Sequence, residues 1–329
     1  MKKGILLINT GSPVTPEVDD VKQYLTDFLT DPRVINIPYL FRHILVKGII
    51  APKRAPKSAD KYRLIWTPEG FPLQILTDEL AERMSSLGQL PVYSSMRYNR
   101  GSVDDALMRA AQDDIEELII LPLFPHYAMS SYESAVQHVV AQHKKGLYTY
   151  ALKCVRPYFD HPAYIDLLVE QIATYAKSHS DLLLSYHGIP LSQTKSYLGN
   201  RDKDYEAQCN KMTELIFSSD KIQSLHLKPV VGYQSRLGNN KWLSPATEDQ
   251  IRTLARDSRV ISVFCPSFVC DNLETSWEID IHERDNFIKA GGKDLTFIPC
   301  PNASAACAEV LLLVAIDGDA TNATEWTKP

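Results

Sequence analysis

The sequence lacks the features that mark several classes of protein. Only 14 of its 329 residues are glycine, and the turn Gly11-x-Pro13 lacks the glycine spacing of a dinucleotide-binding loop, so a nicotinamide enzyme is a poor fit. No apolar run approaches the ~20 residues that cross a bilayer. The net charge of −5 gives no excess of positive charge, which argues against a nucleic-acid partner.

Cysteines are also few and have no metal-binding spacing. The chain has six, and no C-x-x-C pair occurs among them. This usage favours reduced thiols in a cytoplasmic protein over a disulfide framework. Cys300 and Cys307 alone are too few to favour an iron–sulfur cluster. The residues after Met1 run into an expected strand without a signal peptide, so we expect a cytoplasmic location.

What is present indicates an α/β protein with two similar halves. Apolar segments of strand length alternate with amphipathic helical segments, which predicts parallel, doubly wound sheets. We expect a first Rossmann-like lobe over 1–158, a second over 159–316, and a loose polar tail over 317–329. A first strand is expected near the N-terminus and another around Leu182 to Leu184, leading to His187. The other expected strands cover 91–96, 117–123, 149–155, 228–234, 259–265 and 294–298.

Three landmarks recur in the same order in the two halves. Leu6–Pro13 matches the pattern of Leu183–Pro190, with Thr10 in the place of His187, and a Pro-Val pair leading to an arginine follows in each half. A strand that ends in proline comes third. The pattern predicts two related lobes. Thr10 cannot perform the chemistry of a histidine, so only the second lobe would supply a reactive residue. A cleft between the lobes would need a reactive residue on one side only.

His187 is the first candidate for chemistry. It follows the apolar residues Leu182 to Leu184, and Gly188 and Pro190 end the expected strand. Open α/β sheets place their ligands at the carboxyl ends of strands. A histidine there can take up a proton or bind a metal near neutral pH, although the position also fits a structural turn.

A second candidate is a row of ligand-type side chains on an expected helix over 271–290. Glu274, Glu278 and His282 are each four residues apart, which on an α-helix gives one stripe. A solvated acidic face is the other interpretation. Because this helix would begin beside the edge that presents His187, the two features together indicate a site for a divalent cation or for proton removal.

The segment 37–50 is apolar on more than one face and is followed by Lys53, Arg54 and Lys57. It fits either a helix buried between the lobes or an exposed apolar lip suited to a membrane surface or an apolar ligand.

Four motifs resemble the ferrochelatase family of bacterial type, in register over residues 4–302. They are Leu7–Pro13, Leu184–Pro190, Gly232–Gly238 with Trp242–Thr247, and Cys265–Thr275. The resemblance implies a chelatase-like fold and an enzyme that inserts Fe²⁺ into protoporphyrin IX, with loss of two pyrrole protons, in the last step of haem synthesis. Porphyrin and ferrous iron are then the substrates, and no prosthetic group is required.

The resemblance also implies roles for single residues. His187 and Glu274 would be the catalytic pair and, with Glu278 and His282, would bind or pass the metal; whether His187 accepts a proton or holds iron stays open. Asp271 would orient His187. Many relatives have a carboxylate where this chain has His282. Porphyrin contacts would come from Thr10, Arg54, Tyr62, Arg97, Tyr98, Trp242 and Phe268.

By the same resemblance, 37–50 forms a lip that can touch the inner membrane where porphyrin partitions, which gives a cytoplasmic protein with peripheral membrane contact. Other interpretations are a chelatase for coproporphyrin III or cobalt and a porphyrin- or haem-binding protein without catalysis. The residues leave the oligomeric state open.

Overall fold

The computed structural model describes residues 1–236, 241–257, 259–317 and 320–327. The chain folds into two compact units. The first comprises Met1–Leu123, Met129–Arg156 and Leu311–Pro329, and the second comprises Phe124–Ala128 and Pro157–Val310. The C-terminal residues therefore belong to the first unit, although the chain passes through the second before it reaches them.

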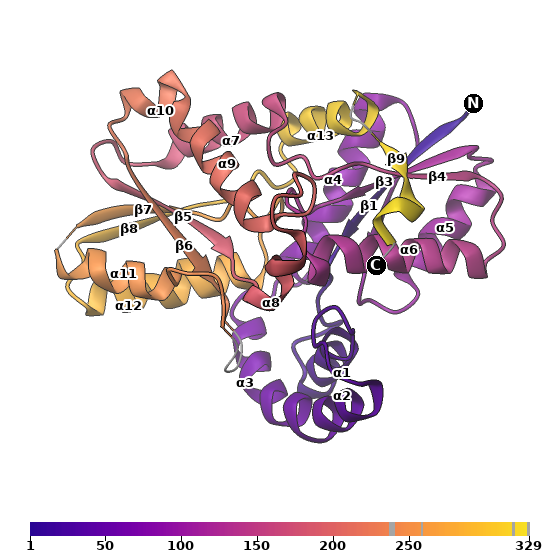
Figure 1. The fold of residues 1–329 in the computed structure, drawn as a ribbon, viewed down its shortest axis with the longest axis horizontal. Coiled ribbons are helices and arrows are strands. Elements are labelled where there is room, and N and C mark those ends of the chain that lie inside the picture. Colours follow the sequence, from indigo (N-terminus) through magenta and orange to yellow (C-terminus); the bar gives the residue numbers. More distant parts are fainter. Residues whose placement is uncertain (237–240, 258, 318–319, 328–329) are drawn as a thin grey trace. The chain divides into compact units, whose positions relative to one another are not determined.

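Each unit contains a parallel sheet, and the two sheets share one strand order (Figure 1). The first sheet has the order β2-β1-β3-β4-β9 and the second β6-β5-β7-β8, so the order of the first four strands is the same. This confirms the predicted parallel α/β architecture and fits the predicted repeat. The parallel strands are β1 (Lys3–Asn9), β2 (Val92–Met96), β3 (Glu117–Pro122), β4 (Ala151–Cys154), β5 (Asp181–His187), β6 (Lys228–Gln234), β7 (Val260–Phe264) and β8 (Asp294–Ile298).

Helices cover both faces of each sheet. In the second unit, α7 and α9 lie on one face and α11 and α12 on the other, and in the first unit α4 and α13 lie opposite α5 and α6 (Figure 1). Strands buried on both faces need continuous apolar runs, and β3 is buried at all six positions. These helices are α4 (Pro72–Gly88), α5 (Ser102–Gln112), α6 (Ser134–Lys145), α7 (Pro162–Tyr175), α9 (Tyr205–Ser218), α11 (Thr247–Arg256), α12 (Arg284–Lys289) and α13 (Ala305–Asp317).

The core of the second unit fixes the strand that ends in His187. Leu183 of β5 packs with Ile261 and Val263 of β7 and with Phe287 of α12, and all four side chains are fully buried. Fully burying one such side chain stabilises a fold by ~1.5–3 kcal/mol, so β5 has little freedom to move. The remaining elements of this unit are α8 (Leu191–Thr194), the 3₁₀ turn η3 (Lys195–Tyr197), α10 (Asp220–Ser224) and the helix η4 (Leu273–Glu283).

The helix predicted over 271–290 differs from expectation. Residues Leu273–Glu283 form a π-helix, η4, and only Arg284–Lys289 are α-helical. At the junction the Arg284 N–H donates to the Ile279 carbonyl, five residues earlier. Spacings of four residues fit an α-helix and a π-helix almost equally well, so the sequence pattern could not distinguish them.

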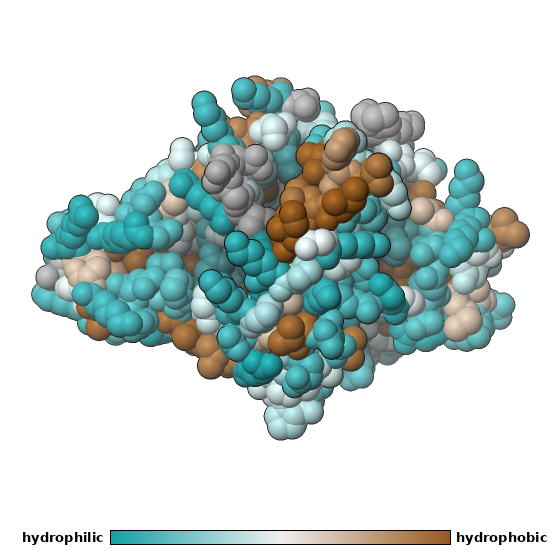
Figure 2. All heavy atoms as spheres, turned by 90° about the horizontal axis from the view of Figure 1, so that it is seen from below, coloured by the Kyte–Doolittle hydropathy of each residue, from teal (hydrophilic) through white to brown (hydrophobic). Residues whose placement is uncertain are grey.

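The segment 37–50 forms α2 (Tyr39–Leu45) and a π-helical turn, η1 (Val46–Ile50). The turn η1 packs with α2 and with two neighbouring helices, α3 (Ala51–Arg63) and α1 (Val18–Leu29). Of the two interpretations, the exposed lip matches the structure, because apolar side chains of this segment project into solvent as a compact brown patch (Figure 2). We call this patch the apolar lip, and its exposed residues are Tyr39, Leu40, Phe41, Ile44 and Ile49.

The loose tail predicted for the C-terminus is wrong for the described residues of that segment. β9 (Thr321–Asn322) pairs antiparallel with β4, and η5 (Ala323–Thr327) follows it. Trp326 is only 5% exposed and packs edge-on against Tyr132 of the turn η2 (Met129–Glu133). The apolar area that this tryptophan buries stabilises the attachment of the polar C-terminal segment to the first sheet.

Candidate functional site

His187 lies at the carboxyl end of β5, as predicted, and its backbone is held on both sides. The His187 N–H donates to Ser267 Oγ (3.1 Å), and the Tyr205 hydroxyl donates to the His187 carbonyl (2.7 Å). Gly188 follows, and a side chain there would place Cβ 2.5 Å from the Gln234 carbonyl. Only glycine therefore lets the chain turn at this point.

Glu274 faces the His187 ring across a short gap. His187 Nε2 lies 3.4 Å from Glu274 Oε1, and the two side chains are 32% and 37% exposed. Glu274 sits in the first turn of η4, where Asn272 Oδ1 accepts from the Glu274 N–H (2.8 Å) and caps the helix. The structure thus brings together the two residues that the sequence paired from distant motifs.

Glu278 is held at the same end of the sheet by a residue in an unusual conformation. Ser235 directly follows β6 and has a φ of 63°, a left-handed value that is uncommon for serine. This turn aims its N–H and its hydroxyl at the same carboxylate, at 3.0 Å from Oε1 and 2.8 Å from Oε2. Strain that is kept at one position usually serves a site.

Gln234, the last residue of β6, joins the strands to the helix. Its Nε2 donates to the Glu274 carbonyl (2.8 Å), and its Oε1 accepts from Ser185 Oγ (2.7 Å) on β5. The strand that carries His187 and the helix that carries Glu274 are therefore tied through one buried amide.

The charges of the three groups depend on one another. Burial, together with the negative charge of Glu274, raises the pKa of Glu278 to about 7 against the opposing hydrogen bonds from Ser235. Burial would lower the pKa of His187, but the Glu274 and Glu278 carboxylates outweigh it and hold that pKa above 6.5. The site therefore contains an imidazole of raised basicity beside a carboxyl group that titrates near neutral pH.

Aromatic side chains border the His187 ring. The Phe268 ring lies edge-on with its centroid 6.1 Å from that of His187. Trp242 forms a bridge to Pro190, and its buried indole N–H has no hydrogen-bond partner among the described residues. Both were predicted porphyrin contacts, and the structure places both next to the turn that follows β5.

Asp271 makes hydrogen bonds that the sequence did not reveal. Its carboxylate accepts from Asn302 Nδ2 (2.7 Å), Thr275 Oγ1 (2.9 Å) and the Cys300 N–H (3.3 Å), and no hydrogen bond joins it to His187 within the described residues. Asp271 instead fastens the start of η4 to the loop after β8. The orienting contact to His187 that the resemblance implies stays a prediction.

His282, the last residue of the predicted stripe, also makes contacts that the sequence did not reveal. Its ring stacks on Trp277, with centroids 4.9 Å apart, and its Nε2 is 3.9 Å from Glu283 Oε1. In the described part of the chain, no group of three or more His, Cys, Asp or Glu side chains is placed to hold a metal ion.

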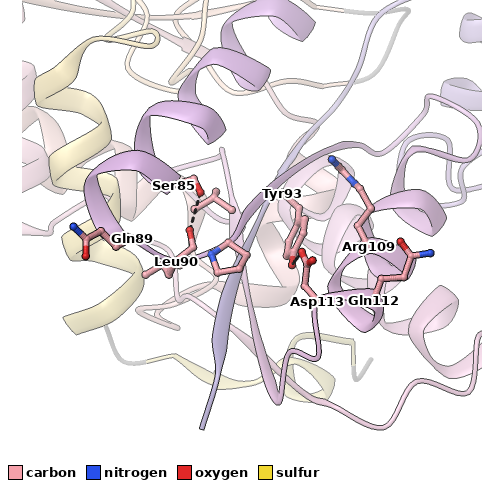
Figure 3. A pocket seen from close by; sticks show the side chains of 9 residues that line it. Ser85, Gln89, Leu90, Tyr93, Arg109, Gln112 and Asp113 are labelled. Atoms are coloured by element: carbon pink, nitrogen blue, oxygen red, sulfur yellow. Dashed lines mark hydrogen bonds between the residues drawn. The ribbon is translucent and has the colours of Figure 1, made fainter.

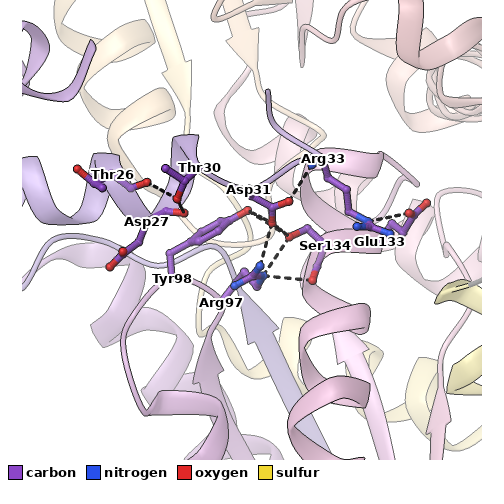
Figure 4. Close-up of polar contacts among 9 residues, drawn as sticks. All are labelled: Thr26, Asp27, Thr30, Asp31, Arg33, Arg97, Tyr98, Glu133 and Ser134. Carbon is purple, nitrogen blue, oxygen red and sulfur yellow. Dashed lines mark hydrogen bonds and ion pairs between the residues drawn. The ribbon is translucent and has the colours of Figure 1, made fainter. Parts of the chain in front are cut away.

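Arg97 and Tyr98, predicted to bind porphyrin, belong to a polar network of the first unit (Figure 4). Arg97 Nη2 is 2.8 Å from Asp31 Oδ2, and its Nε is 3.0 Å from Ser134 Oγ. The Tyr98 hydroxyl donates to the same Asp31 oxygen (3.0 Å). Burial tends to raise the pKa of Asp31, but hydrogen bonds from Ser134 and the Arg33 N–H, with the charge of Arg97, lower it below 3.8.

The other predicted porphyrin contacts of the first unit have different surroundings. Thr10 follows β1 and is partly exposed, in the position that His187 has on β5. Tyr62 on α3 is 6% exposed and packs edge-on against Phe71. Arg54 on the same helix is exposed, and no hydrogen bond or ion pair to it is found in the described residues.

Four residues that hold the site were not predicted in those roles. Ser235, Gln234 and Ser267 lie inside the motifs identified in the sequence. Their membership of those motifs could have been used to predict that they lie near His187 and Glu274. Tyr205 opens a helix far from any motif, and nothing in the sequence marks it.

Known proteins resemble the whole chain. The family model described as Ferrochelatase matches residues 2–317. A ferrochelatase of Porphyromonas gingivalis is 38% identical over 322 residues, covering 92% of this chain and 92% of the relative. A ferrochelatase of Opitutus terrae is 37% identical over 320 residues, covering 91% and 93%.

Solved structures share the fold at low sequence identity. SirB from Bacillus subtilis, solved with Fe³⁺, superposes with a TM-score of 0.55 at 10% identity and covers 96% of this chain and 97% of its own. DR2241 from Deinococcus radiodurans gives 0.52 at 12% identity and covers 98% and 56%. The motifs, the His187–Glu274 pair and the match over almost the full length lead to one conclusion: the chain belongs to the ferrochelatase family.

Proposed function

We propose that this chain inserts Fe²⁺ into protoporphyrin IX and forms protohaem. As a member of the ferrochelatase family it is a metal chelatase of haem synthesis that places iron in a porphyrin. The reaction replaces two pyrrole N–H protons with one Fe²⁺ ion, so the site needs groups that accept protons. The observation that supports the proposal is the pairing of His187 with Glu274 at 3.4 Å.

His187 suits the role of proton acceptor. An imidazole beside a carboxylate is a stronger base than a free one, because the negative charge favours its protonated form. Glu274 then stabilises the imidazolium that forms. Glu278, with a pKa of about 7, can pass a proton toward solvent or hold the entering iron. His282 is a candidate for an outer metal contact, since stacking of its ring on Trp277 leaves its ring nitrogens available.

Porphyrin binding draws on apolar and cationic groups. Phe268 and Trp242 offer ring faces beside His187, and binding energy gained on a large flat ring can be used to distort it toward the metal-accepting shape. Thr10 and Tyr62 remain candidates for further contacts. Arg54 is free to meet a propionate, whereas Arg97 is already committed to Asp31.

Two alanine substitutions distinguish the role proposed for Arg54 in porphyrin binding from the role of Arg97 in stability. Arg54→Ala should raise the KM for porphyrin several-fold with little change in thermal stability, because an exposed guanidinium with no partner supports nothing else. Arg97→Ala should lower stability, since it leaves Asp31 buried without its cation. Steady-state kinetics and thermal unfolding of both variants give the comparison, and an unchanged KM in Arg54→Ala would remove it from the porphyrin site.

We also propose that the apolar lip touches the cytoplasmic face of a membrane. Lys47 within this segment and Lys53 and Lys57 just after it are exposed, and cations near exposed apolar side chains suit an anionic lipid surface. No helix in the described residues is long and apolar enough to cross a bilayer. We expect the protein to need no prosthetic group, with iron and porphyrin as its substrates.

The direct test is an anaerobic assay of purified protein with protoporphyrin IX and Fe²⁺, followed by porphyrin absorbance and fluorescence. Wild type should convert the porphyrin, and His187→Ala and Glu274→Ala should bind it without conversion. Parallel assays with coproporphyrin III in place of protoporphyrin IX, and with Co²⁺ in place of Fe²⁺, identify the preferred combination of porphyrin and metal. Tight binding of every porphyrin without conversion by wild type would instead indicate a binding protein.

A further inference from the structure

The open edge of the first sheet carries two adjoining hollows that the proposed chemistry does not use. One of about 710 Å³ is lined by the end of α4, by β2 and by α5, and one of about 550 Å³ continues along the same strand. Val92 and Arg109 line both. Figure 3 shows Tyr93 and Asp113 side by side here, with Arg109 on the neighbouring helix. Both hollows lie in the first unit, whereas His187 lies in the second.

The backbone of β2 has free hydrogen-bonding groups on this side. Its register pairs Ile5 with Val92 and Leu7 with Ser94, and the ladder runs from the Ile5 N–H to the Pro91 carbonyl and from the Arg97 N–H to the Asn9 carbonyl. In a parallel pair, alternate residues face the partner strand, so the N–H and C=O groups of Val92 and Ser94 point away from β1. No hydrogen bond to them is found in the described residues.

Ser102 marks the end of this open edge. Its hydroxyl accepts from the Met96 N–H (2.8 Å), which is the next outward-facing donor along β2. The free stretch is therefore the three residues Val92 to Ser94, which is short enough to avoid sheet-to-sheet aggregation and long enough to bind one extended segment.

The walls of the two hollows are acidic. The carboxylates of Asp78, Glu82, Asp105 and Asp113 line them, against the one guanidinium of Arg109. Asp78 accepts from Gln74 and Ser94, and Asp113 accepts from Tyr93, but none of the four has an ion-pair partner in the described chain. Four unpaired carboxylates along a strand edge attract a cationic ligand and repel a second copy of the same edge.

We propose that β2 is a docking edge that takes up an extended, lysine- or arginine-bearing segment of a partner protein as an added strand. Main-chain hydrogen bonds from Val92 and Ser94 would align the segment, and the acidic walls on α4 and α5 would select its charge. A self-paired dimer at this edge would bring eight carboxylates together, so the occupant is a different, basic chain.

The probe is a fluorescent, capped heptapeptide of alternating lysine and valine, titrated into the full-length protein. We expect saturable binding that weakens as salt rises, and new protection of the Val92 and Ser94 amides in hydrogen exchange. Two matched peptides separate charge from strand pairing: one with glutamate for lysine, and one with N-methylated valines that cannot donate. Each should bind at least ~10-fold more weakly.

Protein variants test the same edge. Ser94→Pro removes an outward N–H that the ladder does not use and also the hydroxyl bond to Asp78, so Ser94→Ala, which loses only that bond, is compared with it. Glu82→Lys with Asp105→Lys reverses two exposed charges. Ser94→Pro, relative to Ser94→Ala, and the charge reversal should each weaken binding at least ~10-fold. Glu79→Lys, on α4 but outside the hollows, is the matched control. Equal binding of the N-methylated peptide, absence of amide protection, or a wild-type dimer that Ser94→Pro dissociates would each overturn the proposal.

Discussion

At the scale of single residues, the site depends on side chains that hold the reactive ones. Ser235 fixes Glu278 with two hydrogen bonds, and Ser267 and Tyr205 fix the backbone of His187. A reactive group that is 1 Å out of place loses much of its effect, so these contacts are part of the chemistry. They also explain how Glu278 stays near His187 although burial opposes its charge.

Replacing Ser235 with glycine tests this control. Glycine accepts the left-handed φ of 63° and keeps the N–H, but loses the hydroxyl bond to Glu278. The carboxylate is then less stabilised, so the pKa of Glu278 should rise by roughly one unit above about 7. The part of the pH profile in which kcat increases with pH should shift to higher pH by the same amount. The pH dependence of kcat measures this.

His179→Gly is the control for that substitution. His179 is also left-handed, with a φ of 61°, but it precedes the amino end of β5. Its pH profile should match that of wild type. An unshifted limb in Ser235→Gly would mean that Glu278 does not govern the profile.

A second residue-scale prediction concerns Asp31, which the sequence did not mark. Its lowered pKa means that it stabilises the fold above its ordinary value of 3.8, and that this stability is lost as pH falls through 3.8 toward the lower folded-state value. Asp31→Asn should therefore cost about 3 kcal/mol at pH 7, because Arg97 loses its buried partner, and much less near pH 3.

Urea unfolding at the two pH values checks this difference. Asp27→Asn serves as the comparison, since Asp27 pairs with the exposed Arg100 and such pairs contribute at most ~1 kcal/mol. If Asp31→Asn destabilised the protein equally at both pH values, the charge of Asp31 would not be the cause.

At the scale of elements, the sequence predicted strands better than helices. Most parallel strands contain a short apolar run near turn residues, and the limits of β6 fall where expected. The π-helix η4 escaped prediction because its i, i+4 carboxylates suit two helix types. The orienting role of Asp271 was taken from the family resemblance, and nothing in the sequence pattern pointed to its hydrogen-bond partner Asn302, which lies 31 residues away.

The apolar lip is the element with the most direct prediction. Phe41 is 67% exposed on α2, and burying such a side chain in a lipid interface contributes ~1.5–3 kcal/mol. Phe41→Asp should reduce binding to vesicles of phosphatidylglycerol and phosphatidylcholine at least ~10-fold, as measured by co-sedimentation. Leu147→Asp, at an apolar side chain that is 84% exposed elsewhere, should leave binding unchanged. Equal loss in both variants would exclude a specific role for the lip.

At the scale of the whole molecule, two units with the same strand order carry different residues at matching positions. β1 and β5 occupy the same place in their sheets, and Thr10 follows the first where His187 ends the second. The repeat could be predicted because its landmarks are short, strong turn signals. The return of the C-terminus to the first unit could not, because β9 is a two-residue strand without a pattern of its own.

The central claim is that His187 and Glu274 act as one unit in iron insertion. The most direct measurement is kcat/KM for Fe²⁺ insertion in wild type, His187→Ala, Glu274→Ala and the double variant, assayed anaerobically at one pH. Residues that act together are strongly non-additive, so the double variant should be no slower than the slower single one. If instead the two losses multiplied, the residues would act independently, and the pairing seen at 3.4 Å would not be the basis of catalysis.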